Sequence, residues 1–117
     1  MIETQELQKL TNDHIAFAEE YRQARAKAGK AKREFYIFLA ARLPEIRKER
    51  KSIGLEMATL AAILDENVKM CWEEWQMWED KYKGLEKLID ALKVKISLTQ
   101  SIMKYFLEGE KNKNLSP

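Results

Sequence analysis

Two long ladders of mostly apolar residues constrain this chain of 117 residues more than any other feature. Their spacing alternates between three and four residues, which is the period of one face of an α-helix. The first ladder consists of Leu7, Leu10, His14, Phe17, Tyr21, Ala24, Ala28, Ala31, Phe35 and Phe38. The second consists of Val68, Cys71, Trp75, Trp78, Tyr82, Leu85, Ile89, Leu92, Ile96, Thr99, Met103 and Phe106. They predict one helix at about 4–51 and another at about 65–108.

The segment between the ladders predicts a corner. After Phe38 the apolar positions move by one residue, to Leu39, Leu43 and Ile46, and Pro44 lies beside this change of phase. Because proline removes a backbone donor and crowds the preceding turn, we expect a kink or a break near Leu43. Residues 52–54 then predict a turn, with Ser52 as an N-cap for a short helix at about 55–64.

Two helices of equal length joined by a compact corner predict an all-α fold, a long antiparallel helical hairpin. We expect one domain at 1–110 and a flexible tail at 111–117, which is polar. Leu88, Leu98 and Ile102 widen the second ladder beyond what one neighbouring helix covers. A hairpin of this kind often pairs with a copy of itself, so we expect a homodimer that forms a helical bundle.

The composition favours a soluble protein of the cytoplasm. Cys71 is the single cysteine, whereas a small secreted domain usually carries several in disulfides. The first six residues lack the basic start and apolar stretch of a signal peptide. The longest nearly apolar run, residues 57–64, is far shorter than the roughly 20 residues that span a bilayer. We therefore expect no membrane association.

Charge is segregated along the chain although the net charge is +2. Residues 22–51 contain 11 basic and 3 acidic residues, whereas residues 65–90 contain 8 acidic residues and 4 lysines. One interpretation makes the basic segment a surface for DNA or another acidic partner. Its candidate residues are Arg33, Arg42, Arg47, Lys48, Arg50 and Lys51. The other interpretation, which we favour, pairs the basic segment with the acidic start of the second long helix.

The sequence provides no set of residues for catalysis. One cysteine and one histidine cannot supply the roughly four ligands of a zinc site, and both lie on the apolar ladders. Glu66, Glu73 and Glu74 surround Cys71 in sequence, and their negative charge disfavours a reactive thiolate. The four glycines are isolated and form no phosphate loop. We expect a protein that is not an enzyme and uses no metal, cofactor or small-molecule substrate.

Three tryptophans form the most distinctive local cluster. Trp75 and Trp78 lie on the second ladder, where packing in the core is the simpler interpretation. Trp72 lies three residues before Trp75 and extends that face. Because tryptophan is enriched at the energetic centres of protein interfaces, Trp72 is the candidate for contact with a partner, together with its two neighbours.

The order of features from residue 43 to residue 105 resembles a group of small helical proteins. The similar segments are LPEIRKERK at 43–51, SIG at 52–54, YKGLEKLIDALK at 82–93 and ISLTQSIMKY at 96–105. Such proteins are encoded in the early gene clusters of bacteriophages and prophages, near replication and recombination genes. The resemblance implies an accessory role in DNA metabolism, or in control of a host factor, inside a bacterial cell. The alternative is a structural or inhibitory protein-binding module without affinity for nucleic acid.

Overall fold

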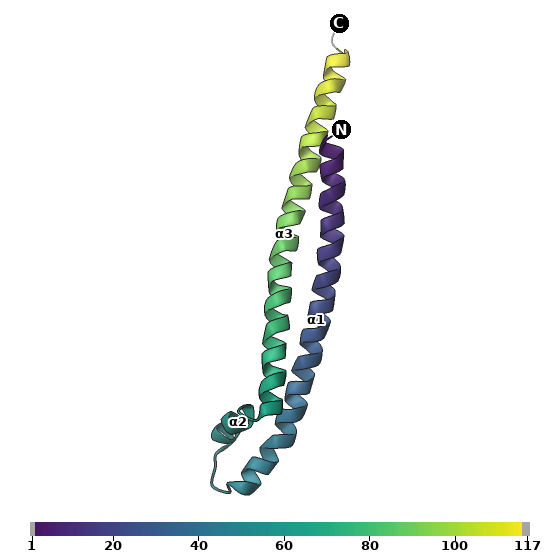
Figure 1. Cartoon of the computed structure of the whole chain (residues 1–117). Helices are drawn as coiled ribbons and strands as arrows, with labels where there is room; N and C mark the ends of the chain where they lie inside the picture. The colour runs from purple at the N-terminus through teal and green to yellow at the C-terminus, as the bar shows by residue number, and fades with distance from the viewer. Residues whose placement is uncertain (1, 116–117) are drawn as a thin grey trace. The chain divides into compact units, whose positions relative to one another are not determined.

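The computed structural model describes the backbone of residues 2–115, and the side chains of residue 2 and residues 4–109. Three helices follow one another: α1 (Ile2–Glu49), α2 (Leu55–Ile63) and α3 (Glu66–Leu115) (Figure 1). No strand occurs in the described part of the chain. The predicted all-α class, with two long helices and a short one between them, is confirmed.

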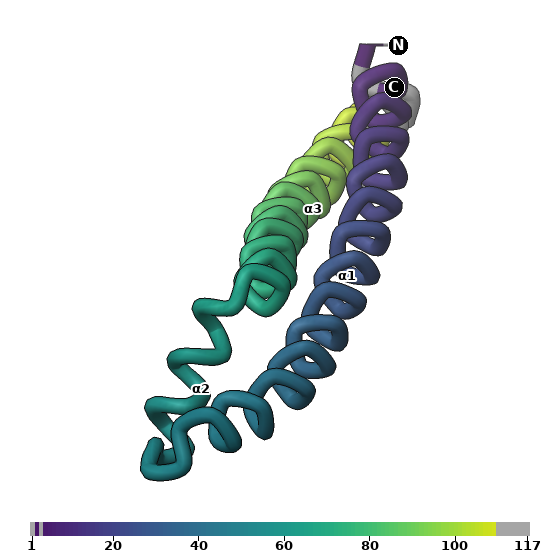
Figure 2. The backbone as a smooth tube through the Cα atoms, turned by 60° about the horizontal axis from the view of Figure 1, so that its bottom comes forward, coloured from purple at the N-terminus to yellow at the C-terminus, as the bar shows by residue number. Residues whose placement is uncertain are grey.

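The chain forms two compact units, and both long helices contribute to each. Unit 1 contains residues Met1–Tyr21 and Gly84–Pro117, and unit 2 contains Arg22–Lys83. Within each unit the segments of α1 and α3 lie side by side and run in opposite directions (Figure 2). This is the antiparallel helical hairpin that the ladders predicted. The single domain expected over 1–110 stays a prediction, since the same two helices build both units.

Unit 2 holds two apolar clusters that share Leu39. Phe35, Val68 and Cys71 are buried in the first, with Leu39, Ile63 and Trp75 packed against them. In the second, Ile46 of α1 is buried with Ala58 and Ala62 of α2, and Leu39 and Leu43 pack against them. The ladder of α1 therefore changes phase directly after Phe35, one step earlier than the sequence suggested. Phe38 lies outside the core as a result, with 41% of its surface exposed.

Pro44 does not interrupt α1, so of the two outcomes expected near Leu43, a kink or a break, the break does not occur. The helix continues to Glu49, and the N–H of Arg50 donates to the carbonyl of Ile46 at 2.8 Å. Its last turns curve toward α2 in both ribbon views (Figures 1 and 2). Proline removes one hydrogen bond of the helix, and the burial of Ile46 against Ala58 and Ala62 holds the following turn in place.

The corner has a different cap from the one predicted. Gly54, in an extended conformation, precedes α2, and its carbonyl accepts from the N–H of Ala58 at 2.9 Å. No side chain caps this helix, so the assignment of Ser52 as its N-cap was wrong. Asp65 does cap α3, because its Oδ1 accepts from the backbone N–H of Asn67 at 3.1 Å.

Unit 1 is covered less completely than unit 2. Leu10 and Leu85 are buried, whereas Leu88, Leu98 and Ile102 are each at least half exposed. Phe106, the last member of the second ladder, is also exposed. The helix itself ends later than predicted, at Leu115 instead of about 108. The tail expected at 111–117 therefore includes helical backbone as far as 115, and residues 116 and 117 lie outside the described residues.

Across the residues that the structure describes, no helix combines the length and apolar character needed to cross a lipid bilayer.

Phe35 and Phe38 provide a matched test of the core of unit 2. Phe35 is 6% exposed and Phe38 is 41% exposed, although they lie one helical turn apart. Phe35→Ala leaves a cavity beside Val68 and Cys71, and we expect a loss of about 3–5 kcal/mol in the free energy of unfolding. Phe38→Ala should cost less than half as much. Urea denaturation followed by circular dichroism measures both, and equal losses would contradict the position of the phase change.

Candidate functional site

The exposed side of unit 2 carries an apolar groove between α1 and α3. The groove has a volume of about 470 Å³ and is lined by Phe38, Asn67, Met70, Cys71, Glu73, Glu74, Met77 and Trp78. Met70 and Met77 are 61% and 55% exposed, so the thioethers of α3 face solvent instead of a neighbouring helix. Methionine side chains adapt to differently shaped apolar partners, and they are common on surfaces that bind helices.

The groove has an acidic edge. Glu73 and Glu74 line it, and both are exposed. The Nζ of Lys69 lies 3.9 Å from Oε1 of Glu73, so this carboxylate has a weak partner on its own helix. An apolar floor beside carboxylates suits a partner that brings apolar side chains together with lysine or arginine.

Sequence reasoning missed this groove, although a signal for it was present. Asn67, Met70, Glu74 and Met77 follow the same three-four spacing as the buried ladder, displaced by one residue toward the N-terminus. Such a displaced ladder lies along one edge of the buried face of a helix. Its mixture of apolar and charged residues hides it from a search for apolar periodicity alone.

The three tryptophans occupy different surroundings. Trp75 is half-buried, with its ring centroid 5.7 Å from that of Phe35 and 6.2 Å from that of Tyr36. Trp78 is also half-buried, and the Nζ of Lys27 lies 4.4 Å from its ring centroid. Trp72 is 43% exposed and does not line the groove. It follows Cys71 by one position whereas Met70 precedes it, so Trp72 lies on the other edge of the buried face.

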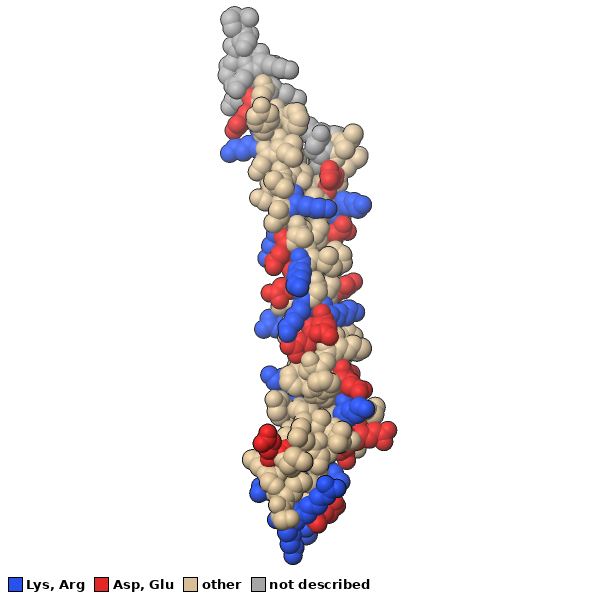
Figure 3. Space-filling model, turned by 90° about the vertical axis from the view of Figure 1, so that its left-hand side faces the viewer, with Lys and Arg blue, Asp and Glu red and all other residues tan. Residues whose placement is uncertain are grey.

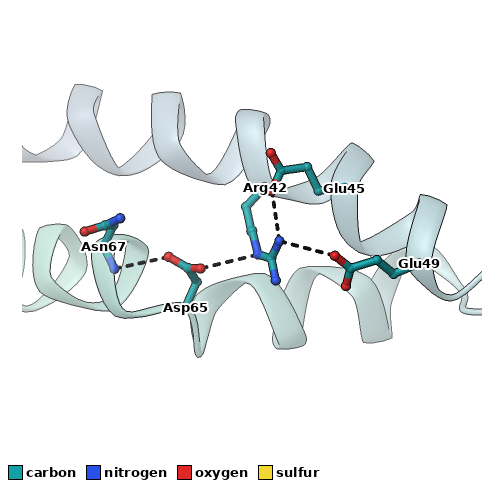
Figure 4. Close-up of polar contacts among 5 residues, drawn as sticks. All are labelled: Arg42, Glu45, Glu49, Asp65 and Asn67. Carbon is teal, nitrogen blue, oxygen red and sulfur yellow. Dashed lines mark hydrogen bonds and ion pairs between the residues drawn. The ribbon is translucent and has the colours of Figure 1, made fainter.

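Arg42 is enclosed by carboxylates and differs in this from the other basic candidates. Its Nη1 donates to Oε2 of Glu45 at 2.8 Å and lies 3.9 Å from Oε1 of Glu49. Its Nε lies 3.3 Å from Oδ2 of Asp65, an ion pair that joins α1 to the start of α3 (Figure 4). The hydrogen bond to Glu45 contributes most to raising the pKa of Arg42 above its ordinary value. The structure thus gives Arg42 a role in closing the corner.

Four of the other basic candidates gather where α1 ends. Arg47 and Lys48 belong to the last turn of α1, Arg50 and Lys51 follow directly, and all four are exposed. Within the described chain, the structure records no ion pair for these four side chains. Figure 3 shows Lys and Arg concentrated at the lower end of the molecule, where this corner lies. We call these four residues the basic corner.

Arg33 lies apart from the basic corner. It is exposed on α1, and 14 positions separate it from Arg47, which corresponds to roughly 21 Å along a helix. The structure therefore does not combine the six basic candidates into one surface. The favoured interpretation, pairing with the acidic start of α3, is observed for Arg42 and Asp65.

The two residues that could suggest chemistry belong to different units. Cys71 is buried beside Phe35 and Val68, and burial raises the pKa of its thiol, with Glu34 and Glu74 raising it further. His14, in unit 1, is half-buried and lines a small hollow with Tyr21, Glu86, Asp90 and Lys93. Among the described residues, no group of three or more His, Cys, Asp and Glu is arranged to hold a metal ion.

Comparison with protein-family models, with curated proteins and with solved structures found no significant match.

The raised pKa of Cys71 predicts that its thiol reacts slowly with alkylating agents and that the free energy of unfolding falls at high pH. In the unfolded chain a cysteine thiol ionises at about pH 8.5. The folded protein holds its proton at higher pH, so this stabilisation is complete below that value and is lost as pH rises through the folded pKa. We expect alkylation by iodoacetamide to be at least ten times slower in the native protein than in urea.

Cys71→Ala provides the control for this prediction. Between pH 8 and pH 10 the unfolding midpoint of the natural protein should fall more steeply than that of the variant. Parallel pH profiles, or native alkylation as fast as in urea, would show that the thiol is accessible and ordinary.

Proposed function

We propose that this chain is a non-catalytic binding protein that holds an amphipathic helix of a partner protein in the groove of unit 2. The partner helix presents apolar side chains to Phe38, Met70, Met77 and Trp78, and lysine or arginine to Glu73 and Glu74. The observation that carries the proposal is the exposure of two methionines and a phenylalanine side by side in a groove with an acidic edge.

This assignment gives the three tryptophans separate tasks. Trp75 packs within unit 2 against Phe35, while Trp78 contributes one side of the groove. Trp72, exposed on the other edge of α3, is left for a second contact with the same partner or with another one. The resemblance to phage-encoded helical proteins supports a host factor, or a protein of DNA replication or recombination, as the partner inside a bacterial cell. The homodimer expected from the sequence likewise stays a proposal.

Two synthetic helices test the groove directly. Both carry the same leucine face and no tryptophan, and they differ in having lysine or glutamate at all flanking positions. We expect the lysine peptide to change the tryptophan fluorescence of the protein and to bind at least tenfold more tightly than the glutamate peptide. Met77→Gln should weaken this binding at least fivefold, because it places a polar amide on the apolar floor of the groove.

Met57→Gln is the matched control, since Met57 is 60% exposed on α2 and does not line the groove. Equal binding of the two peptides, or equal effects of the two substitutions, would refute the groove as a selective site.

The second candidate function is binding of nucleic acid through the basic corner. The specific observation in its favour is that Arg47, Lys48, Arg50 and Lys51 are all exposed and that the structure records no ion pair for them within the described chain. Four arginine and lysine side chains at one corner can contact several phosphates of a duplex or a single strand. In this function the groove binds the partner helix and the basic corner binds nucleic acid in one nucleoprotein assembly.

A titration with double- and single-stranded DNA at two salt concentrations tests the second function. Four phosphate contacts predict that log K falls against log salt with a slope of about −3.6 for duplex DNA. The double variant Arg50→Gln, Lys51→Gln should reduce that slope by about 2. The control, Lys69→Gln with Lys83→Gln, removes the same charge from lysines that pair with Glu73 and Glu79 on α3. Absence of binding at low salt would exclude this function.

A further inference from the structure

Unit 1 has an exposed apolar face on α3 that unit 1 itself does not cover. The face consists of Leu88, Ala91, Lys95, Leu98, Ile102 and Tyr105. All six are exposed, Leu88 and Ile102 by 50%, Leu98 by 58% and Tyr105 by 75%. Figure 3, in which α3 faces the viewer, shows uncharged atoms over much of its upper part. We call these six residues the 88–105 face.

The spacing within the 88–105 face is that of a coiled-coil seam. Successive members are three, four, three, four and three residues apart, which is the alternation of the a and d positions of a heptad. Each member directly precedes a residue of the ladder that packs against α1, such as Ile89, Leu92 or Ile96. The face therefore lies beside the intramolecular contact, where a third helix would pack.

We propose that the 88–105 face binds the same face of a second copy of this chain, with the two α3 helices antiparallel. An interface of this kind is symmetric, so one set of residues must complement itself. If residue i faces residue 193 − i of the second copy, three kinds of layer form along the seam. Leu88 meets Tyr105, Ala91 meets Ile102, and Lys95 meets Leu98.

The charges beside the seam agree with this direction. In the antiparallel register Lys87 of one copy lies next to Glu108 of the other, since their numbers add to 195 and both flank the seam on one side. Asp90 of one copy and Lys104 of the other, whose residue numbers add to 194, face each other farther from the seam. All four side chains are exposed on α3. The two-fold axis repeats each attraction, so the arrangement contains four opposite-charge pairs.

Lys95 discriminates against the parallel arrangement. In a parallel pair the same heptad position meets its own copy, so two Lys95 ammonium groups would face each other within the seam. In the antiparallel pair Lys95 meets Leu98, and its aliphatic stem can lie on the leucine while the ammonium reaches solvent. A charged residue at a single seam position commonly selects one arrangement at a cost in affinity.

The association should be weak and dependent on concentration. The seam spans 18 residues, which is about 27 Å of helix, and one of its six positions is charged. Interfaces of this size lie near the lower end of the range for specific complexes. The dimer therefore forms at high local concentration. The groove of unit 2 shares no residue with the 88–105 face.

Sedimentation equilibrium over about two orders of magnitude in protein concentration tests the association. We expect a monomer–dimer equilibrium that Leu98→Glu weakens at least 100-fold, while Ile15→Glu, on an exposed residue of α1 in the same unit, leaves it within threefold. A protein that stays monomeric throughout overturns the proposal. A dimer that Leu98→Glu leaves intact also overturns it.

Two further measurements test the direction. Lys87→Glu should weaken the dimer about three- to tenfold, and adding Glu108→Lys in the same chain should restore it. In a Cys71→Ala background, a mixture of Ala91→Cys and Ile102→Cys should form a mixed disulfide under mild oxidation, with little disulfide from either variant alone. Disulfides within the Ala91→Cys variant alone would show a parallel pair and overturn the antiparallel seam.

Two substitutions distinguish loss of the dimer from loss of peptide binding in the groove. Met77→Gln should weaken binding of the lysine peptide at least fivefold without changing the dimer. Leu98→Glu should weaken the dimer without changing binding of the peptide. A dimer that is lost with Met77→Gln and kept with Leu98→Glu would place the contact between copies in the groove of unit 2 and overturn the 88–105 face.

Discussion

The burial of small side chains on α1, on the face that meets the aromatic ladder of α3, is the constraint on which unit 2 depends. Ala24, Ala28 and Ala31 are almost fully buried, whereas the ladder of α3 opposite carries aromatic residues such as Trp75. Small residues bring two helix backbones together, and large ones on the partner fill the remaining space at the density of a protein interior. Because the alanine side chains are short, the rings of α3 extend to the edge of α1. There Lys27 and Lys32 lie over Trp78 and Trp75.

The fold was predictable from the sequence where one interaction dominates, and less so where several compete. Two ladders of apolar residues allow few alternatives to two long helices. At Pro44 the lost hydrogen bond favoured a kink or a break. The helix stays continuous because Ile46 is buried against α2, and this tertiary contact is invisible in the local sequence. Phe38 looked like a core residue because a three-residue step from Phe35 continues the three-four alternation, whereas the core follows the four-residue step to Leu39.

The charged candidates show why a count of charges is a weaker guide than geometry. Six basic residues looked equivalent in the sequence, yet Arg42 pairs with Glu45 of α1 and with Asp65, which caps α3. Arg33 lies apart on α1. What distinguishes Arg42 is the direction of its side chain toward Asp65, which depends on how α1 packs against α3. The residues of the basic corner lie at the end of α1 and just after it. The carboxylate at the start of α3, Asp65, pairs with Arg42 instead.

A helix that buries only one face of its surface can still carry two apolar ladders, and α3 does so. The buried ladder is covered by α1, and the ladder displaced by one residue remains exposed in both units. In unit 2 it contains Met70, Glu74 and Met77, a soft and acidic surface that fits a helix of different composition. In unit 1 it contains Leu88, Leu98 and Ile102 with opposite charges at its two ends, a pattern that complements itself when reversed. The same offset along one helix thus favours a foreign partner in one unit and a second copy in the other, because adaptability suits the first and charge symmetry suits the second.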